Sequence, residues 1–328
     1  MSRSRLGAAD YCKGVRAGDR RLVAKTITLL ESRRADHVEL GQQVLEQLVP
    51  DSGGALRVGI TGPPGVGKST LIETLGLDLI QKGHRLAVLA VDPTSPVSGG
   101  SILGDKTRMT RLAQATEAFI RPSPSGLTLG GVAHRTREAL LVCEAAGYDI
   151  VMVETVGVGQ SETEVAAMVD FFALLLQPGA GDELQGIKRG VLELADALVV
   201  SKADGEHAQA AARTRADYSH ALHLLSPPSE SWSPPVLSVS ARSGEGIAEL
   251  WETILRQREV GLESGELSAR RRRQARAWFW RLVEEGLEGR FRADPAVAAL
   301  IPELEKQVDE CASSAPAAAR VLLDKFRS

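Results

Sequence analysis

One segment, GPPGVGKST at residues 62–70, constrains the fold more than any other part of this chain. It follows an apolar run typical of a strand, LRVGIT at residues 56–61, and precedes the helical pattern LIETLGLDLIQKG. Every position of the pattern G-x-x-x-x-G-K-[ST] is filled, in the order strand, loop and helix that the pattern needs. The sequence therefore predicts a P-loop, whose backbone N–H groups and following helix N-terminus bind phosphate groups.

Two side chains of this loop have predicted roles in phosphate chemistry. Lys68 is placed to reach the β- and γ-phosphates of a nucleoside triphosphate, and Ser69 to hold Mg²⁺ through its hydroxyl group. Position 63 is Pro, so the additional loop lysine of the deviant ATPase P-loops is absent.

Short apolar runs alternate with helical patterns along the middle of the chain. Several runs are apolar on both faces, which is typical of strands buried between two layers of helices. Strand–helix alternation over about 200 residues predicts an α/β fold, a P-loop NTPase with a mostly parallel, doubly wound sheet. The predicted strands are residues 56–61, 86–91, 149–155, 171–177, 196–201 and 236–240.

Helical patterns precede and follow this α/β region. The first runs from about residue 10 to residue 49 and ends at PDSGG. The second begins near residue 258 and has a break at RADP, residues 292–295. We therefore expect a helical N-terminal extension (1–54), a P-loop domain (55–257) and a helical C-terminal extension (258–328).

The composition argues against nucleic acid and membrane partners. Of the 328 residues, 43% are hydrophobic and 25% are charged, and the formal net charge of −3 gives no general attraction to anionic polymers or lipids. The first residues contain no apolar segment typical of a signal peptide, and no apolar stretch reaches the ~20 residues that cross a bilayer. Cys12, Cys143 and Cys311 lie far apart and form no CxxC pair, so we expect reduced thiols and a cytoplasmic location.

Carboxylates at the ends of neighbouring strands are candidates for the metal site. Asp92 follows the run 86–91, and Glu154 ends the run 149–155. Asp105 lies in the Gly-rich segment GGSILGDKTRM, where capping of the following helix explains it as well as metal binding does. The P-loop favours a metal site made of Ser69 and these carboxylates. Gly157 is expected to let the backbone approach the γ-phosphate.

The segment VVSKADG ends a late strand of the same sheet and resembles the base-reading sequence Asn-Lys-x-Asp. Asp204 can accept the two protons that guanine offers, and adenine has no matching pair of donors, so guanine is the predicted base. The stem of Lys202 is expected to cover the base. Ser201 replaces the usual asparagine, and we expect its secondary hydrogen bonds to be weakened or lost. Backbone N–H groups of a further loop are expected near guanine O6, at Ser240, Ala241 and Arg242.

Four longer segments resemble the MeaB/ArgK family of P-loop GTPases: VDPTSPVSGGSILGDKTRM, FIRPSPSG, ETVGVGQSETEVA and PGAGDELQGIKRG. The resemblance covers about residues 10–290. By residue match it implies nucleotide contacts at Gly62, Pro63, Pro64, Gly65, Val66, Gly67, Lys68, Ser69, Thr70, Asp204 and Ser240 to Arg242. It places the metal-site carboxylates at Asp92, Asp105 and Glu154.

The family also implies a function. Its members hydrolyse GTP to gate cofactor loading, and they protect and reactivate an adenosylcobalamin-dependent methylmalonyl-CoA mutase or a relative of it. The resemblance further implies a homodimer, and we expect the C-terminal extension to serve dimerisation. The segment from Asp182 to Lys188, which includes Gln185, matches a loop that responds to the nucleotide and faces the mutase.

Other functions are weighed against this one. A signal-recognition-type targeting GTPase would need a DTAGR-like motif and a basic, Met-rich or membrane-binding module, and a nickel-type metal-insertion GTPase would need Cys/His motifs; the chain has neither set. The run Arg270–Arg273 next to Trp278 and Trp280 raises the question of RNA binding. A solvated helix face with the tryptophans packed at an interface explains that run more simply.

Overall fold

The computed structural model describes residues 6–32, 34–91, 109–122, 129–155, 161–179, 189–222 and 229–326. The chain forms two compact units, Met1–Arg271 and Arg272–Ser328. The first contains the sheet and the second is helical in its described part.

The first unit is built on a parallel sheet, which confirms the predicted fold class. Within the described residues the sheet has seven strands in the order β3-β2-β4-β1-β5-β6-β7, and every neighbouring pair is parallel. The strands are β1 (Leu56–Thr61), β2 (Leu86–Val91), β3 (Ala118–Arg121), β4 (Ile150–Thr155), β5 (Phe171–Leu176), β6 (Ala197–Val200) and β7 (Val236–Ser238). Six of them lie within the runs predicted from the sequence.

The seventh strand, β3, was not predicted as a strand. It has only four residues, Ala118–Arg121, and among the described residues it pairs with β2 alone, at one edge of the sheet. So short a run shows no periodicity of its own, and pairing with β2 decides its conformation.

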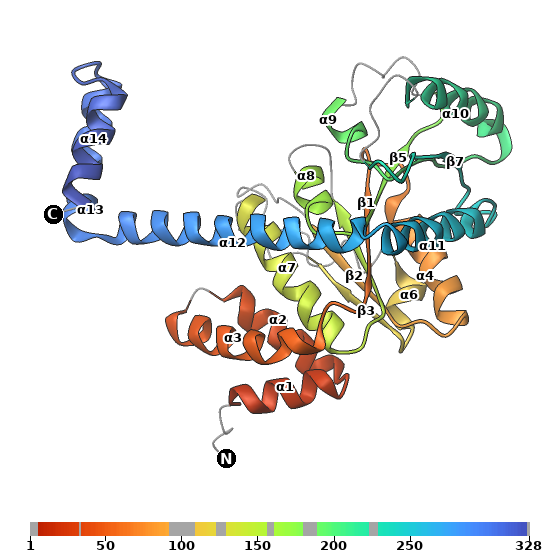
Figure 1. Cartoon of the computed structure of the whole chain (residues 1–328), viewed down its shortest axis with the longest axis horizontal. Coiled ribbons are helices and arrows are strands. Elements are labelled where there is room, and N and C mark those ends of the chain that lie inside the picture. Colours follow the sequence, from red (N-terminus) through yellow and green to blue (C-terminus); the bar gives the residue numbers. More distant parts are fainter. Residues whose placement is uncertain are drawn as a thin grey trace. The chain divides into compact units, whose positions relative to one another are not determined.

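Helices cover both faces of the sheet (Figure 1). One hydrophobic core joins one face to α4, α6 and α11, and the other core joins the opposite face to α7 to α10 and to the N-terminal helices. The helices on the first face are α4 (Lys68–Gln81), α6 (Thr110–Gln114) and α11 (Ile247–Glu263). Those of the other face are α1 (Ala8–Arg16), α2 (Arg20–Glu31), α3 (Ala35–Leu48), α7 (Leu129–Ala145), α8 (Ser161–Ala166), α9 (Arg189–Leu192) and α10 (Ala208–Leu222), with short 3₁₀ turns at Val49–Asp51 and Gly205–His207.

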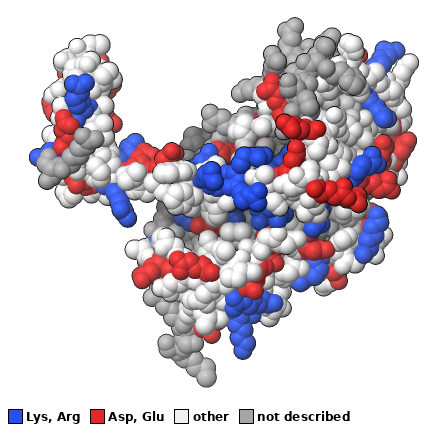
Figure 2. Space-filling model, viewed as in Figure 1, with Lys and Arg blue, Asp and Glu red and all other residues white. Residues whose placement is uncertain are grey.

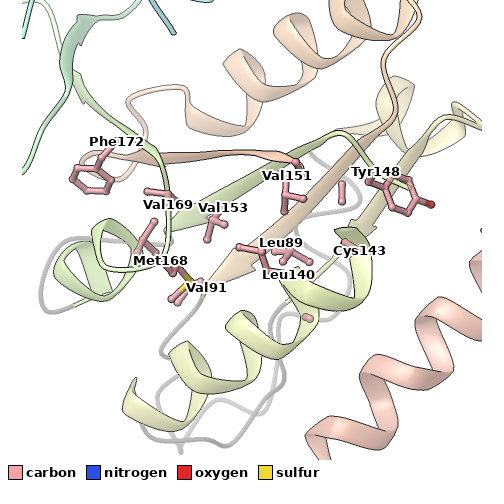
Figure 3. Close-up of a cluster of buried hydrophobic side chains, with 14 of the residues drawn as sticks. Leu89, Val91, Leu140, Cys143, Tyr148, Val151, Val153, Met168, Val169 and Phe172 are labelled. Carbon is pink, nitrogen blue, oxygen red and sulfur yellow. The ribbon is translucent and has the colours of Figure 1, made fainter. Parts of the chain in front are cut away.

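The central strands are apolar on both faces because both faces are covered. Figure 3 shows Leu89 of β2 and Val151 and Val153 of β4 pointing toward Leu140 of α7. In the middle of the sheet, β1 carries Gly59, where a Cβ would lie 2.9 Å from side-chain atoms of Phe172 and Val165. Glycine here lets the layer above approach β1 closely.

Helices α1 to α3 form an outer layer next to α7 (Figure 1). Their inward side chains Val23, Ile27, Val44 and Leu48 are fully buried and belong to the same core as α7. The N-terminal helices therefore belong to the first compact unit.

The beginning of α12 (Glu266–Ala293) is held at the amino ends of β5 and β6 by two buried ion pairs. Arg271 binds Asp170 through two nitrogens at 2.6 and 2.7 Å, and Arg270 binds Asp196 through two nitrogens, both at 2.8 Å. The two aspartate side chains are at most 1% exposed. The hydrogen bonds to Asp170 raise the pKa of Arg271.

These pairs correct one expectation from the sequence. Figure 2 shows Lys and Arg side chains gathered over the first part of α12. Arg270 and Arg271 are nevertheless half-buried and paired, so the run Arg270–Arg273 is not simply a solvated face. Trp280 is 57% exposed in the single chain, so its expected packing at an interface stays a prediction.

The second unit contains the rest of α12, α13 (Pro295–Asp309) and α14 (Ala315–Phe326). The break predicted at residues 292–295 is present, because Asp294 accepts hydrogen bonds from the N–H groups of Ala296 and Val297 and so begins α13 with Pro295 in its first turn. Phe291 and Phe326 pack edge to face.

We predict that Arg271→Ala lowers the free energy of unfolding by about 3–5 kcal/mol, because it leaves the buried Asp170 carboxylate without its ion-pair partner. Urea unfolding without nucleotide measures the change. Arg272→Ala removes the neighbouring exposed arginine and should change the free energy by less than about 0.5 kcal/mol. Equal stability of the two variants would show that the ion pair does not hold the helix.

Candidate functional site

The loop between β1 and α4 has the backbone shape that phosphate binding requires. Gly62 has φ of 147°, and a Cβ there would lie 2.6 Å from the carbonyl oxygen of Leu175. Gly67 has φ of 103° and is the N-cap of α4, without a side-chain cap. The first N–H groups of α4 therefore face the loop, as in an anion-binding helix N-terminus.

Lys68 lies inside this loop and is only 8% exposed. Its Nζ donates hydrogen bonds to the carbonyl oxygens of Gly62 at 2.7 Å and Pro63 at 3.2 Å. The ammonium group is thus held against carbonyl oxygens at the start of the loop. A cation here suits the β- and γ-phosphates of a nucleotide.

Ser69 and Glu154 come together next to the loop. The hydroxyl of Ser69 donates a hydrogen bond to Glu154 Oε1 at 2.8 Å, and Glu154 is 2% exposed. Glu154 lies opposite Ile60 in the β1–β4 ladder, near the carboxyl ends of these two strands. The hydroxyl oxygen of Ser69 and the carboxylate of Glu154 therefore meet at the carboxyl edge of the sheet. A hydroxyl and a carboxylate form an oxygen donor set that fits Mg²⁺. The described residues contain no cluster of three or more His, Cys, Asp or Glu side chains.

Ser201 connects the base-reading segment to the P-loop, so of the two outcomes expected for its hydrogen bonds, weakening or loss, the structure contradicts loss. Its hydroxyl lies 2.7 Å from the carbonyl oxygen of Val66 and 3.1 Å from that of Leu176, and it is buried. The single hydroxyl proton makes its shorter contact with Val66. The shorter side chain suffices because β6 ends directly beside the loop.

Lys202 reinforces the same connection. It has a positive φ of 53°, and its Nζ donates a hydrogen bond of 2.7 Å to the carbonyl oxygen of Gly65. Asp204 follows at the entrance of a 3₁₀ turn and is half-buried, and its side chain does not cap that turn. The carboxylate is thus near the surface and close to the P-loop.

The second predicted base loop lies directly beside the first. The N–H of Ala203 donates to the carbonyl oxygen of Val239 at 3.0 Å, so residues 201–204 and 239–242 run next to each other. Ser240 is fully buried, and its hydroxyl oxygen accepts a hydrogen bond from the N–H of Ser243. Ala241 is half-buried and Arg242 is exposed.

Thr74 was not predicted as a site residue. Its hydroxyl donates a 2.9 Å hydrogen bond to the carbonyl oxygen of Ala241 and so ties α4 to the base loop. No sequence signal distinguishes this threonine from other polar residues of an amphipathic helix.

The structure brings together the P-loop, Glu154, Lys202, Asp204 and the loop at residues 240–242. The other predicted residues fall outside the described part of the chain: Asp92, Asp105, Gly157, Asp182, Gln185 and Lys188. Their roles stay predictions.

Comparison with known proteins decides the family. The protein-family model described as methylmalonyl-CoA mutase-associated GTPase MeaB matches residues 23–296 of this chain. The chain belongs to the MeaB family. This confirms the resemblance drawn from the sequence, and the protein is a GTPase that binds guanine nucleotides.

Individual relatives agree with this MeaB assignment. A Caulobacter vibrioides protein named as a GTPase is 57% identical over 310 residues, which cover 94% of this chain and 95% of the relative. The mouse mitochondrial methylmalonic aciduria type A homolog is 50% identical over 325 residues, covering 96% of this chain and 78% of the relative. A crystal structure of a LAO/AO transport system kinase matches with a TM-score of 0.78 and 38% identity, covering 99% of this chain and all of that one.

Among the described residues, none of the helices of this MeaB protein is both long enough and apolar enough to cross a membrane.

We predict that Ser201→Ala weakens GTP and GDP binding about fivefold, because it removes a hydrogen bond worth roughly 1 kcal/mol that holds the base loop against Val66. Ser201→Asn should restore the affinity, and the preference for GTP over ATP should stay the same in both variants. Isothermal titration calorimetry measures the dissociation constants. Ser219→Ala is the matched control, since the hydroxyl of Ser219 bonds only within α10; an equal loss in the control would refute the connecting role of Ser201.

Proposed function

We propose that this GTPase is a chaperone of an adenosylcobalamin-dependent methylmalonyl-CoA mutase, in which GTP hydrolysis gates cofactor loading and protects and reactivates the mutase. The observation that carries the proposal is the match of the mutase-associated MeaB family model over residues 23–296, on a chain whose P-loop and base loop are joined by direct hydrogen bonds. A relative whose name refers to methylmalonic aciduria supports the same partner.

The described residues support separate roles in hydrolysis for Lys68, Ser69 and Glu154. Lys68 binds the β- and γ-phosphate oxygens, and the N–H groups at the α4 N-terminus hold the phosphates in place. Ser69 and Glu154 would hold Mg²⁺, and Asp92 and Asp105, which lie outside the described residues, are assigned from the sequence as further ligands or water-mediated partners. Mg²⁺, when bound, neutralises charge on the phosphate oxygens. Gly157 lets the backbone approach the γ-phosphate.

Base selection is assigned to Asp204. Its carboxylate accepts the N1 and N2 protons of guanine, while the stem of Lys202, anchored on Gly65, covers the base. N–H groups of Ala241 and Arg242 are assigned to guanine O6, whereas the N–H of Ser240, which was predicted with them, already donates to the carbonyl oxygen of Glu245 at 2.9 Å.

Communication with the mutase is assigned to the segment that contains Asp182, Gln185 and Lys188. This segment follows β5 in the chain. β5 pairs with β1, the strand that leads into the P-loop. A polar, Gly-rich loop there has few apolar anchors, so bound phosphate can order it.

We also propose a homodimer formed through the second unit. This unit exposes several large apolar side chains that it does not bury itself, and a second copy of the chain would cover them. They are Phe279, Trp280, Leu282, Leu287, Val321, Leu323 and Phe326.

The proposed location is the cytoplasm. All three cysteines are free thiols, of which Cys12 and Cys143 are buried and Cys311 is exposed. Thiols that stay unpaired fit a reducing compartment.

We predict that mutase accelerates GTP hydrolysis by the wild type and that Lys68→Ala lowers turnover at least about a hundredfold, because the cation facing the phosphates is lost. Phosphate release from GTP and from ATP, with and without purified holo-mutase, measures both effects; ATP should not be hydrolysed. Lys82→Ala removes an exposed lysine paired with Asp78 at the other end of α4 and should leave turnover unchanged. A failure of the mutase to bind or to stimulate the wild type would refute the chaperone proposal but not the P-loop assignment.

We predict that Asp204→Asn reverses base preference, since an amide donates where the carboxylate accepts. GTP affinity should fall at least about a hundredfold, and xanthosine triphosphate should bind more tightly than GTP. Competition against a fluorescent nucleotide gives both constants. Asp217→Asn, an exposed position on α10, serves as the control; if GTP affinity is the same in the two variants, Asp204 does not read the base.

A further inference from the structure

A groove of about 750 Å³ opens between α1, α2 and α3, away from the nucleotide loops described above. Its apolar lining includes Tyr11 of α1, Ala24 and Leu29 of α2 and Leu40 of α3. None of the nucleotide-site residues lines this groove. The groove is therefore a candidate binding surface that is separate from the nucleotide site.

Two positively charged side chains border this groove. Arg21 and Lys25 both line it, are exposed, and form no ion pair with any carboxylate in the described parts of the chain. Residues 6–51 contain seven Lys or Arg and seven Asp or Glu, so the layer as a whole carries no excess charge. The positive charge is local to the edge of the groove, which favours a specific acidic contact over a general attraction to anionic surfaces.

The arrangement of these cations favours a row of carboxylates over a single phosphate group. Arg21 and Lys25 are four residues apart, so they lie along α2, one helical turn from each other. The N–H groups of Arg21 and Leu22 are already bound by the Asp19 side chain, so the N-terminus of α2 offers no cradle for an anion. An amphipathic helix with acidic residues one turn apart matches both the apolar lining and the charged edge.

The groove is also connected to the sheet that carries the nucleotide site. Thr28 and Glu31 line it, and both bind Arg121, the last residue of β3. The guanidinium lies 3.3 Å from the hydroxyl of Thr28 and forms an ion pair with Glu31. β3 pairs with β2, which in turn pairs with β4, the strand that holds Glu154. An occupant would thus touch residues bonded directly to this sheet.

We propose that the groove between α1, α2 and α3 docks an acidic amphipathic helix of the partner mutase, with carboxylates of that helix paired to Arg21 and Lys25. The proposal rests on the proposed function, since it names the surface through which the same partner is recognised. It assigns a partner-binding role to the N-terminal layer, which contributes no residue to the nucleotide site.

The test compares the affinity of holo-mutase for three forms of the full-length chain: wild type, the double variant Arg21→Glu/Lys25→Glu, and Lys13→Glu. Lys13 is exposed on α1 and does not line the groove, so it controls for a change of charge in the same layer. We expect the double variant to bind at least about tenfold more weakly and to lose most of the salt dependence of binding, while the control stays within about twofold. GTP hydrolysis without mutase should be equal in all three, which shows that each is folded.

A second variant tests the apolar lining independently of charge. Ala24→Trp fills the groove and should weaken mutase binding to a similar extent. A photo-crosslinking residue in place of Tyr11 should join the chain to an acidic helix of the mutase, identified by mass spectrometry.

Several outcomes would overturn the docking proposal. They are unchanged mutase affinity in both groove variants, a crosslink only to a second copy of this chain, and loss of binding to phosphatidylglycerol vesicles in the double variant with mutase binding intact. Failure of the wild type to bind mutase would instead refute the proposed function, and with it this occupant of the groove.

Discussion

The parallel pairing of β1 with β4 on one side and β5 on the other is the constraint on which the site depends. Because all three strands point the same way, their carboxyl ends meet at one edge. The P-loop leaves β1 at this edge, Glu154 comes from β4, and the carbonyl oxygen of Leu176 in β5 accepts a hydrogen bond from the backbone N–H of Ser201 at 2.9 Å. A shift of one residue in the β1–β4 pairing would turn Glu154 away from Ser69, since alternate side chains of a strand face opposite sides.

The carboxyl edge and the amino edge of the sheet use their polar and charged side chains differently. The carboxyl edge holds polar side chains in hydrogen bonds around the nucleotide loops, and Lys68 and Glu154 are themselves buried there. The amino edge buries its charges in pairs: Arg57 binds Glu144 through two nitrogens, and Asp170 accepts hydrogen bonds from the N–H of Arg57 and from Arg271. Buried charges of this kind cost free energy unless each is paired, so the pairs specify where α12 begins as much as they add stability.

The outer layer of α1 to α3 is also connected to the sheet. It shares its core with α7, yet it leaves a groove whose polar side is bonded to β3 through Arg121. An element that adds nothing to nucleotide binding but is firmly joined to the sheet is well placed to receive a partner. In the proposed arrangement, docking of the partner helix and hydrolysis of the nucleotide use different layers of one compact unit.

The sequence by itself determined the fold class, six of the strands, the P-loop and the family, because each depends on local patterns: two-sided apolar runs, a fixed glycine spacing and long specific motifs. Only the tertiary structure decided that β3 is a strand, that Ser201 keeps a bond to the P-loop, and that Arg270 and Arg271 are paired. These features depend on partners 25 to 135 residues away for Ser201, and 74 and 101 residues away for the two arginines. A side chain's role in such a contact is set by the distance between folded elements, and no local pattern in the sequence encodes that distance.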